Sequence, residues 1–229
     1  MPEQLTFDLP AVPALGRGDF FVSPVNALAV ASIGNWQNWP GGKMVLVGPK
    51  GAGKTHLALV WAGETDACVI SARDLRDDNI ASLVQQHNFV AVEDADKIAG
   101  KTATETALFH LHNLLLAEGG RLLVTAALPP AQWSLGLPDL ASRIQASSLA
   151  TLAPPDDPLM AAILVKLFAD RQLEVSPKLI TYLVTRMERS FTGAQTLVAA
   201  LDLAALSQKR AITRPLAALV LDNLEQNGA

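Results

Sequence analysis

The sequence has little cysteine and no excess of basic residues. Its one cysteine, Cys68, cannot form an internal disulfide, which indicates a reducing compartment and a buried structural thiol. Eighteen lysine and arginine residues stand against 22 aspartate and glutamate residues, a net charge of −4 that argues against an extended nucleic-acid-binding surface. No apolar run reads as a membrane span, and the N-terminus lacks the basic start and long apolar core of a signal peptide. We therefore expect a soluble, cytoplasmic protein without membrane contact.

What the sequence does contain is a phosphate-binding loop of the pattern G-x-x-x-x-G-K-[ST]. Its residues are Gly48, Pro49, Lys50, Gly51, Ala52, Gly53, Lys54 and Thr55. A strand-like apolar run, 44–47, leads into the loop, and a helix-like run, 56–61, leaves it. Glycines let several backbone N–H groups point at one anion, Lys54 reaches the β- and γ-phosphates, and Thr55 holds Mg²⁺. We therefore expect a nucleoside di- or triphosphate here; the alternative, a glycine-rich turn without a ligand, is disfavoured by the flanking strand and helix.

The remaining pattern divides the chain into three segments. Residues 1–18 are punctuated by prolines and glycines and are expected to form an extended tail. In residues 19–154, short apolar strands alternate with helices, the pattern of a parallel sheet covered on both faces. The strand-like runs are 44–47, 67–70, 89–92, 121–125 and 148–152, and the helix-like runs are 26–33, 55–62, 79–86 and 104–117. Residues 155–229 show helical periodicity alone.

Four helices are predicted in the third segment. The first carries apolar residues over 159–168, and the second opens with the N-cap and first-turn proline of Ser176-Pro177. The third covers roughly 191–208, and the fourth begins at Thr213. The predicted fold class is therefore α/β, a P-loop domain with a five-stranded parallel sheet followed by a small helical lid domain, which is the arrangement of an AAA+ module.

The predicted strand 89–92 ends in two carboxylates, Glu93 and Asp94. In phosphate-loop proteins, acids at this place hold Mg²⁺ and position a water molecule. Glu93 takes the metal position, where aspartate is the usual residue, and Asp94 takes the water-activating position. The alternative is a solvated strand end with ordinary acids, but the phosphate loop earlier in the chain favours the functional interpretation.

One arginine lies between the fourth and fifth predicted strands, in Leu140-Ala141-Ser142-Arg143-Ile144. An arginine at this place often reaches across a subunit boundary to a neighbour's γ-phosphate, and such a finger is worth about a thousandfold or more in rate. From the spacing alone, a surface salt bridge explains Arg143 equally well.

Taken in order, these motifs resemble the AAA+ family of the bacterial replication initiator DnaA and its regulatory relative Hda. The segment Asp19-Phe20-Phe21-Val22-Ser23-Pro24-Val25-Asn26 is similar to the family's adenine-wrapping segment, and Gly53-Lys54-Thr55-His56-Leu57 matches its phosphate loop. Pro129-Pro130 and Leu135-Gly136-Leu137-Pro138-Asp139-Leu140-Ala141-Ser142-Arg143 look closer to the Hda branch. The resemblance covers nearly the whole chain.

The resemblance implies roles for individual residues. Phe21, Val22, Asn26 and His56 are expected at the nucleotide together with the phosphate loop, and the ligand is ADP or ATP with Mg²⁺. Arg143 falls on the family's arginine finger, which acts in trans on a partner's nucleotide. DnaA is therefore the expected partner, and the oligomeric state stays open, a homo-oligomer included.

Two positions depart from the DnaA pattern. Ala127 stands where the family has an acidic residue at the γ-phosphate, and Thr192 stands where the lid has a sensor arginine. Arg189 lies one turn from Thr192 and is a candidate substitute at the nucleotide. The site should therefore hold nucleotide tightly and hydrolyse it weakly or not at all.

The N-terminal sequence Gln4-Leu5-Thr6-Phe7-Asp8-Leu9 resembles the peptides that bind the DNA polymerase III β sliding clamp. Gln4 would hydrogen-bond at the rim of the clamp pocket, and Leu5, Phe7 and Leu9 would be apolar anchors. Because no DnaA-type helix-turn-helix domain follows the lid segment, DNA contact is expected only through the clamp.

The resulting hypothesis is a regulator of chromosomal replication initiation. In its nucleotide-bound form it docks on the DNA-loaded clamp and promotes ATP hydrolysis by DnaA, which prevents re-initiation. Two alternatives stay open: a self-hydrolysing AAA+ ATPase such as a helicase loader, and a non-catalytic adaptor that tethers DnaA to the clamp. A phosphate-loop kinase is disfavoured because the helical segment follows the α/β domain and does not interrupt it.

Overall fold

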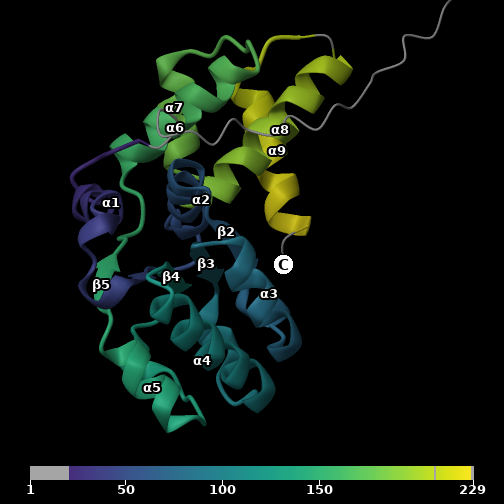
Figure 1. Ribbon diagram of the computed structural model, residues 1–229. Helices are drawn as coiled ribbons and strands as arrows, with labels where there is room; N and C mark the ends of the chain where they lie inside the picture. Colours follow the sequence, from purple (N-terminus) through teal and green to yellow (C-terminus); the bar gives the residue numbers. More distant parts are fainter. Residues whose placement is uncertain (1–20, 209, 228–229) are drawn as a thin grey trace, which may run out of the picture.

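The computed structural model describes residues 21–208 and 210–227. A parallel sheet lies between two layers of helices, and further helices gather at one end of it (Figure 1). The predicted tail, 1–18, and its clamp peptide with Gln4, Leu5, Phe7 and Leu9 lie outside the described residues.

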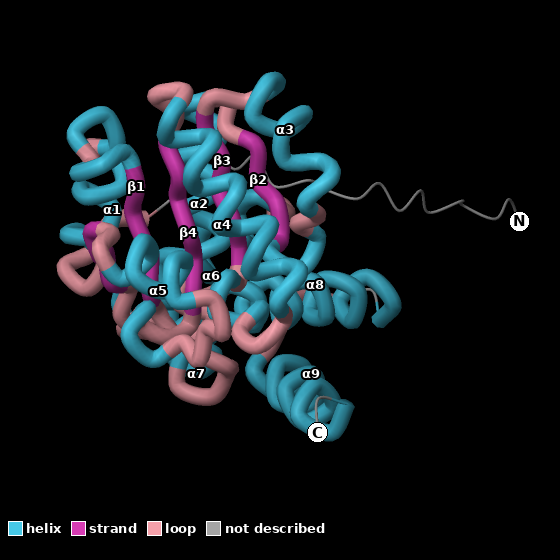
Figure 2. The backbone as a smooth tube through the Cα atoms, turned by 60° about the horizontal axis from the view of Figure 1, so that its bottom comes forward, coloured by secondary structure: helices cyan, strands magenta, loops and turns pink. Residues whose placement is uncertain are grey.

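Five strands form one sheet in the order β2-β3-β4-β1-β5, and every neighbouring pair is parallel. Figure 2 shows β2, β3, β4 and β1 side by side in this order. The strands are β1 (Lys43–Val47), β2 (Cys68–Ser71), β3 (Phe89–Glu93), β4 (Arg121–Ala126) and β5 (Ser148–Thr151). The predicted five-stranded parallel sheet is confirmed. β3 and β4 each run one residue further than expected, because Glu93 pairs with Ser71 and Ala126 pairs with Val47. The carboxyl ends of parallel strands share one edge, so the segments that follow them meet there.

Helices cover both faces of the sheet. On one face lie α1 (Ala27–Gly34) and α2 (Lys54–Thr65), and on the other lie α3 (Ile80–Gln86), α4 (Thr102–Ala117) and α5 (Pro138–Gln145). Met44 and Leu46 of β1 pack into the first core, whereas Val45 and Val47 pack into the second, because successive side chains of a strand point to opposite faces. Burial on both faces explains why the strands are continuous apolar runs.

The connections contain short helical turns, and α5 is not among the helices expected from the sequence. The 3₁₀ helices are Trp36–Asn38, Pro40–Gly42, Ala72–Asp74, Asp77–Asn79, Ala95–Ile98 and Pro130–Gln132. In α5, Pro138 occupies the first turn, where a missing N–H does no harm, and Leu140 and Ile144 are buried.

The third segment forms four helices with a hydrophobic core of their own. They are α6 (Asp157–Asp170), α7 (Pro177–Val184), α8 (Phe191–Gln208) and α9 (Arg214–Asn227). Phe168, Leu183 and Leu201 are buried in this core. The Ser176 hydroxyl caps α7 as predicted, by accepting a hydrogen bond from the backbone N–H of Leu179. The predicted helical lid is confirmed. None of the described helices is both long and apolar enough to cross a lipid bilayer.

Candidate nucleotide-binding site

The phosphate loop connects the end of β1 to the start of α2. Gly51 and Gly53 adopt left-handed backbone conformations, with φ of 81° and 96°, that L side chains rarely adopt. Gly53 immediately precedes α2, so the positive end of that helix faces the loop. The loop therefore has the tight, glycine-dependent turn at a helix start that an anion-binding site requires.

Lys54 is a buried cation in this turn, with 9% of its surface exposed. Its Nζ donates hydrogen bonds to the carbonyl oxygens of Gly48 (2.7 Å) and Pro49 (3.0 Å). Burial lowers the pKa of Lys54, and nearby carboxylates, Asp94 foremost, act in the opposite direction. The ammonium therefore lies between the loop and a group of acids. At this place it is suitably positioned to contact the phosphates of a nucleotide.

Glu93 and Asp94 lie at the carboxyl end of β3, beside the phosphate loop. The backbone N–H of Asp94 donates a hydrogen bond to the hydroxyl of Thr125 on β4 (3.1 Å). The Asp94 carboxylate forms an ion pair with Lys97 one turn later. The acidic turn is thus held by a hydrogen bond to β4 and by an ion pair with Lys97.

Asp96 is a third acid of this turn, and the motif does not include it. Its Oδ2 accepts a hydrogen bond from the backbone N–H of Ala127 (3.0 Å). Ala127, which stands where DnaA has an acidic side chain, therefore has the Asp96 carboxylate hydrogen-bonded to its backbone. The signal in the sequence is an acid two residues after Asp94, which the two-residue motif leaves aside.

Two buried carboxylate oxygens, Glu93 Oε1 and Asp96 Oδ1, have no hydrogen-bond partner among the described residues. A buried charge without compensation is costly, and carboxylate oxygens are ligands that Mg²⁺ prefers. Thr55 lies exposed on the first turn of α2. These residues fit a Mg²⁺ ion shared with nucleotide phosphates. Within 21–208 and 210–227, no group of three or more histidine, cysteine, aspartate or glutamate side chains could hold a metal ion.

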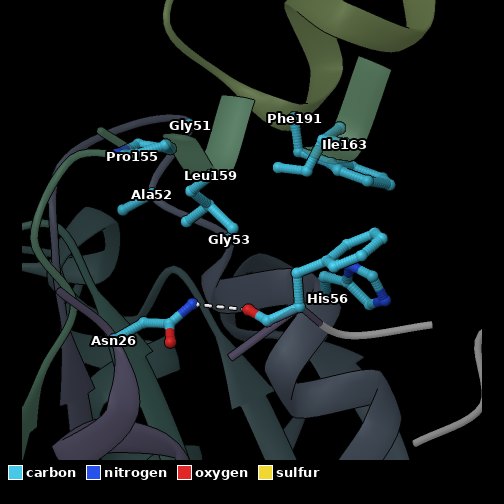
Figure 3. A pocket seen from close by; sticks show the side chains of 10 residues that line it. Asn26, Gly51, Ala52, Gly53, His56, Pro155, Leu159, Ile163 and Phe191 are labelled. Atoms are coloured by element: carbon cyan, nitrogen blue, oxygen red, sulfur yellow. Dashed lines mark hydrogen bonds between the residues drawn. The ribbon is translucent and has the colours of Figure 1, made fainter. Parts of the chain in front are cut away.

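A pocket beside the loop is lined by three separate parts of the chain. Its lining residues are Phe21, Asn26, Gly51, Ala52, Gly53, His56, Pro155, Leu159, Ile163 and Phe191. Figure 3 shows Leu159, Ile163 and Phe191 of the lid facing His56 across the pocket. The ring centroids of His56 and Phe191 lie 4.9 Å apart. An apolar pocket with aromatic walls next to a phosphate loop fits a nucleobase. The sequence motifs pointed to none of the lid residues in this lining.

The residues expected at the adenine have different roles. Asn26 is buried; its Nδ2 donates to the carbonyl oxygen of Phe21 and its Oδ1 accepts from the backbone N–H of Ser23, both at 2.8 Å. These bonds, one of which is drawn in Figure 3, fix the segment that carries Phe21. Val22 lies in a separate pocket between α1 and α2, beside Trp61.

The lid packs directly against the phosphate loop at Ser190. A Cβ added to Gly51 would lie 2.3 Å from Ser190 Cβ, far inside van der Waals contact. The Ser190 hydroxyl accepts a hydrogen bond from the backbone N–H of Gly193 (2.8 Å) and donates one to Glu188 Oε1 (3.0 Å). Ser190 is thereby fixed in the turn before α8, and Gly51 is required for the lid to approach.

The two lid positions compared with the sensor arginine lie at the start of α8. Thr192 is exposed in the first turn, and Arg189 precedes the helix. The Arg189 guanidinium pairs with the Asp157 carboxylate, 2.6 Å from Nη2 to Oδ1, and both side chains are about half exposed. Arg189 is therefore engaged within the lid, and the lining of the pocket does not include it.

Arg143 lies on α5, away from the phosphate loop of its own chain. Lys43 Nζ, at the start of β1, donates a hydrogen bond to the Arg143 carbonyl oxygen (2.7 Å), whereas the loop follows the other end of β1. From Lys43 to Val47, β1 spans about 13 Å. The exposed guanidinium lies over the Phe109 ring of α4, with Cζ 5.4 Å from the centroid. Figure 1 shows α5 at the end of the molecule opposite to the lid helices. Arg143 is therefore accessible to another molecule.

Comparison with known proteins relates the lid to Hda and most of the chain to DnaA. A family model described as "Hda, lid domain" matches residues 157–221. The chromosomal replication initiator protein DnaA of Thermomicrobium roseum is 28% identical over 210 residues, covering 80% of this chain and 44% of that protein. The chain thus spans less than half the length of this relative.

Solved structures of DnaA share the fold. Domain III of the Thermotoga maritima DnaA superposes with a TM-score of 0.80 at 20% identity, over 94% of this chain and 98% of that chain. AMPPCP-bound DnaA from Aquifex aeolicus reaches 0.69 at 18% identity, over 82% of this chain and 65% of that chain. The fold with its phosphate loop is that of an AAA+ protein. Within that class, the chain is related to DnaA and Hda and carries a lid domain of the Hda type.

Proposed function

We propose that this chain is a nucleotide-bound regulator that completes the active site of ATP-loaded DnaA in trans. The observation that carries the proposal is the position of Arg143, which is exposed on α5 and lies away from its own phosphate loop. An arginine finger neutralises the charge that develops on the γ-phosphate and speeds hydrolysis by about a thousandfold or more. DnaA then passes to its ADP form, and re-initiation is suppressed.

In this proposal, the chain's own ADP or ATP is a structural ligand. The phosphates bind the loop from Gly48 to Thr55, Mg²⁺ binds at Thr55 and Glu93, and the base enters the pocket beside His56. The nucleotide analogue AMPPCP bound to the Aquifex aeolicus DnaA supports nucleotide binding by this fold. Because loop and lid both line the pocket, a bound nucleotide would set the angle between the sheet and the lid. The metal would neutralise phosphate charge there.

The proposed docking element is the N-terminal peptide, which would bring the chain to the DNA-loaded sliding clamp. Leu5, Phe7 and Leu9 are apolar anchors, each worth roughly 1.5–3 kcal/mol when buried, and Gln4 hydrogen-bonds at the rim. The cost of ordering the peptide reduces this sum, so a single peptide binds weakly. Several peptides on one ring-shaped clamp, or added contacts to DnaA, strengthen the assembly through avidity.

A self-hydrolysing ATPase is the second candidate, and the acids beside Lys54 favour it. Asp94 would orient the attacking water, and Asp96 supplies a carboxylate next to Ala127. This candidate predicts vigorous single-turnover ATP hydrolysis by the chain alone. The trans proposal predicts slow hydrolysis on this chain and fast hydrolysis on DnaA.

The deciding experiment measures ATP hydrolysis by ATP-loaded DnaA, with clamp loaded on DNA and the ADP-bound chain added. Wild type should accelerate hydrolysis by about a thousandfold or more, and Arg143→Ala should abolish the acceleration. Arg186→Ala is the matched control, since Arg186 also lies over an aromatic ring, that of Tyr182 on the lid (Cζ 4.3 Å from the centroid). It should behave as wild type.

The remaining outcomes separate the alternatives. If neither wild type nor Arg143→Ala stimulates DnaA, the regulator proposal is wrong and the self-hydrolysing ATPase takes its place. If both stimulate equally, the chain acts as a non-catalytic adaptor that brings DnaA to the clamp.

A further inference from the structure

Glu105 is a buried acid that none of the sequence motifs explains. It lies in the first turn of α4 with 1% of its surface exposed. Its Oε1 accepts hydrogen bonds from the backbone N–H groups of Gly100 (2.7 Å) and Gly136 (3.1 Å), and its Oε2 accepts one from Leu137 (2.8 Å). Burial of a carboxylate is tolerated where such donors replace its lost hydration. Both oxygens of Glu105 are therefore committed to holding the backbone.

The three donors belong to two segments that lie near functional side chains. Gly100 follows the acidic turn that begins after β3. Gly136 and Leu137 directly precede α5, the helix that carries the candidate arginine finger. Glu105 thus joins the acidic turn of the nucleotide site to the N-terminal end of α5, where a helix favours negative charge.

The same side of α4 also contacts the rest of α5. Glu105, Phe109 and His112 are spaced by four and three residues, which places them on one face of the helix. Phe109 lies under the Arg143 guanidinium. His112 Nε2 lies 3.1 Å from Lys43 Nζ, the group that donates to the Arg143 carbonyl oxygen. One face of α4 therefore holds the start of α5, the arginine side chain and, through Lys43, the end of α5.

We propose that Glu105 is a positioning residue for Arg143, because it fixes the start of α5 against the acidic turn and so sets the direction in which the guanidinium is presented. The inference rests on the proposed trans role of Arg143. A misplacement of about 1 Å can cost about a hundredfold in rate. Loss of the Glu105 hydrogen bonds should therefore slow hydrolysis on bound DnaA and leave the affinity for DnaA intact.

Glu105→Gln is the informative substitution because it keeps the size of the side chain and removes acceptor capacity. The amide nitrogen of glutamine is a donor and cannot accept from the backbone N–H groups that the carboxylate serves. Glu118→Gln is the matched control, because Glu118 is exposed at the other end of α4 and loses the same charge.

Two measurements on the ADP-bound full chain test the proposal. The first is hydrogen exchange over residues 136–145 in the chain alone, and the second is DnaA-bound ATP hydrolysis at increasing chain concentration. Glu105→Gln should speed exchange at the start of α5 and lower the maximal stimulated rate by about tenfold or more. The half-saturating concentration and the affinity for ADP should stay within about twofold, which marks a loss of transition-state stabilisation. Glu118→Gln should match wild type in both measurements.

Two results would overturn the proposal: unchanged exchange over 136–145, or faster exchange with an unchanged maximal rate. If Glu105→Gln does not fold, Lys43→Met releases the other end of α5 without leaving a buried carboxylate. A similar fall in its maximal rate supports positioning through α5, and a wild-type rate overturns it. If wild type itself fails to stimulate DnaA, the proposed function is wrong, while the exchange measurement still decides whether Glu105 fixes α5.

Discussion

His112 is a buried imidazole beside cationic neighbours. Burial is the first cause that lowers the pKa of His112, and the charges of Lys43 and Arg143 lower it further, while a hydrogen bond with Asn113 acts in the opposite direction. The neutral imidazole therefore belongs to the folded protein, in contact with the lysine that holds the end of α5.

This environment predicts a loss of stability in mild acid. Unfolded, His112 titrates near its ordinary pKa of 6.5, whereas its folded pKa is lower, so between these values the unfolded chain binds the extra proton. The stabilising effect is complete above the unfolded pKa and is lost as the pH falls through the folded one. The urea concentration at the unfolding midpoint of wild type should be lower at about pH 5.5 than at about pH 7.5. His112→Gln should show a smaller decrease between the same two pH values. Equal falls in both proteins would contradict the assignment to His112.

Residues that a local pattern requires can be predicted from sequence, and residues that act across the fold cannot. Gly51 and Lys54 lie within one turn, so their spacing alone fixes their relation to a phosphate. Glu105 bonds to the backbone of Gly136, 31 residues away, and Ser190 meets Gly51 only because the lid packs on the loop. Residues that meet across such long separations in the sequence leave no recurring pattern there. The sequence motifs therefore did not include them.

Among the elements, apolar periodicity predicted the sheet and the lid helices but not α5. This helix has eight residues, of which Leu140 and Ile144 are buried. α7 has the same length but buries four residues, so α5 has the weaker apolar pattern and depends more on contacts made by other elements. Here those contacts are the Glu105 and Lys43 hydrogen bonds at its two ends. Arg143 was recognisable from its motif, whereas the helix that carries it was not.

The contact between the lid and the phosphate loop predicts different effects for two glycine substitutions. Gly51→Ala adds left-handed strain and a clash with Ser190, whereas Gly119→Ala adds strain alone, since a Cβ there would meet no described heavy atom within 4 Å. Both should lower the free energy of unfolding by about 1–2 kcal/mol. Only Gly51→Ala should displace the lid and weaken ADP binding, by about tenfold or about 1.4 kcal/mol. Calorimetric titration with ADP compares the two glycine variants. Equal affinities for ADP would contradict a role of the Gly51–Ser190 contact in nucleotide binding.

In the whole molecule, the nucleotide site and the end of α5 lie at opposite ends of the strands. The phosphate loop, the acidic turn and the lid meet at the carboxyl ends of the strands, whereas Lys43 holds Arg143 at the amino end of β1. Glu105 provides a buried connection between the acidic turn and α5. This separation supports a chain whose own nucleotide is structural and whose arginine serves a partner.

The proposed function also requires delivery to DnaA, and in that proposal the N-terminal peptide supplies it through the clamp. Substitutions in the peptide should therefore remove delivery alone. Leu5→Ala combined with Phe7→Ala removes two apolar anchors, roughly 3–6 kcal/mol before the ordering cost is subtracted. Clamp binding in size-exclusion chromatography should be lost. Thr6→Ala combined with Asp8→Ala is the matched control, since it changes the residues between the anchors, and it should still bind the clamp. Both double variants should bind ADP as wild type does, because the loop and pocket are untouched.

On clamp-loaded DNA, the Leu5→Ala/Phe7→Ala variant should stimulate DnaA only at high concentration. Its Arg143 and α5 are intact, so mass action can replace the effective concentration that the clamp supplies. A titration of DnaA hydrolysis against chain concentration, with clamp present and absent, checks this. Wild-type stimulation at low concentration would show that the peptide does not deliver the chain. If no concentration restores stimulation, the peptide takes part in the catalytic assembly itself, and docking and catalysis are not separable in this chain.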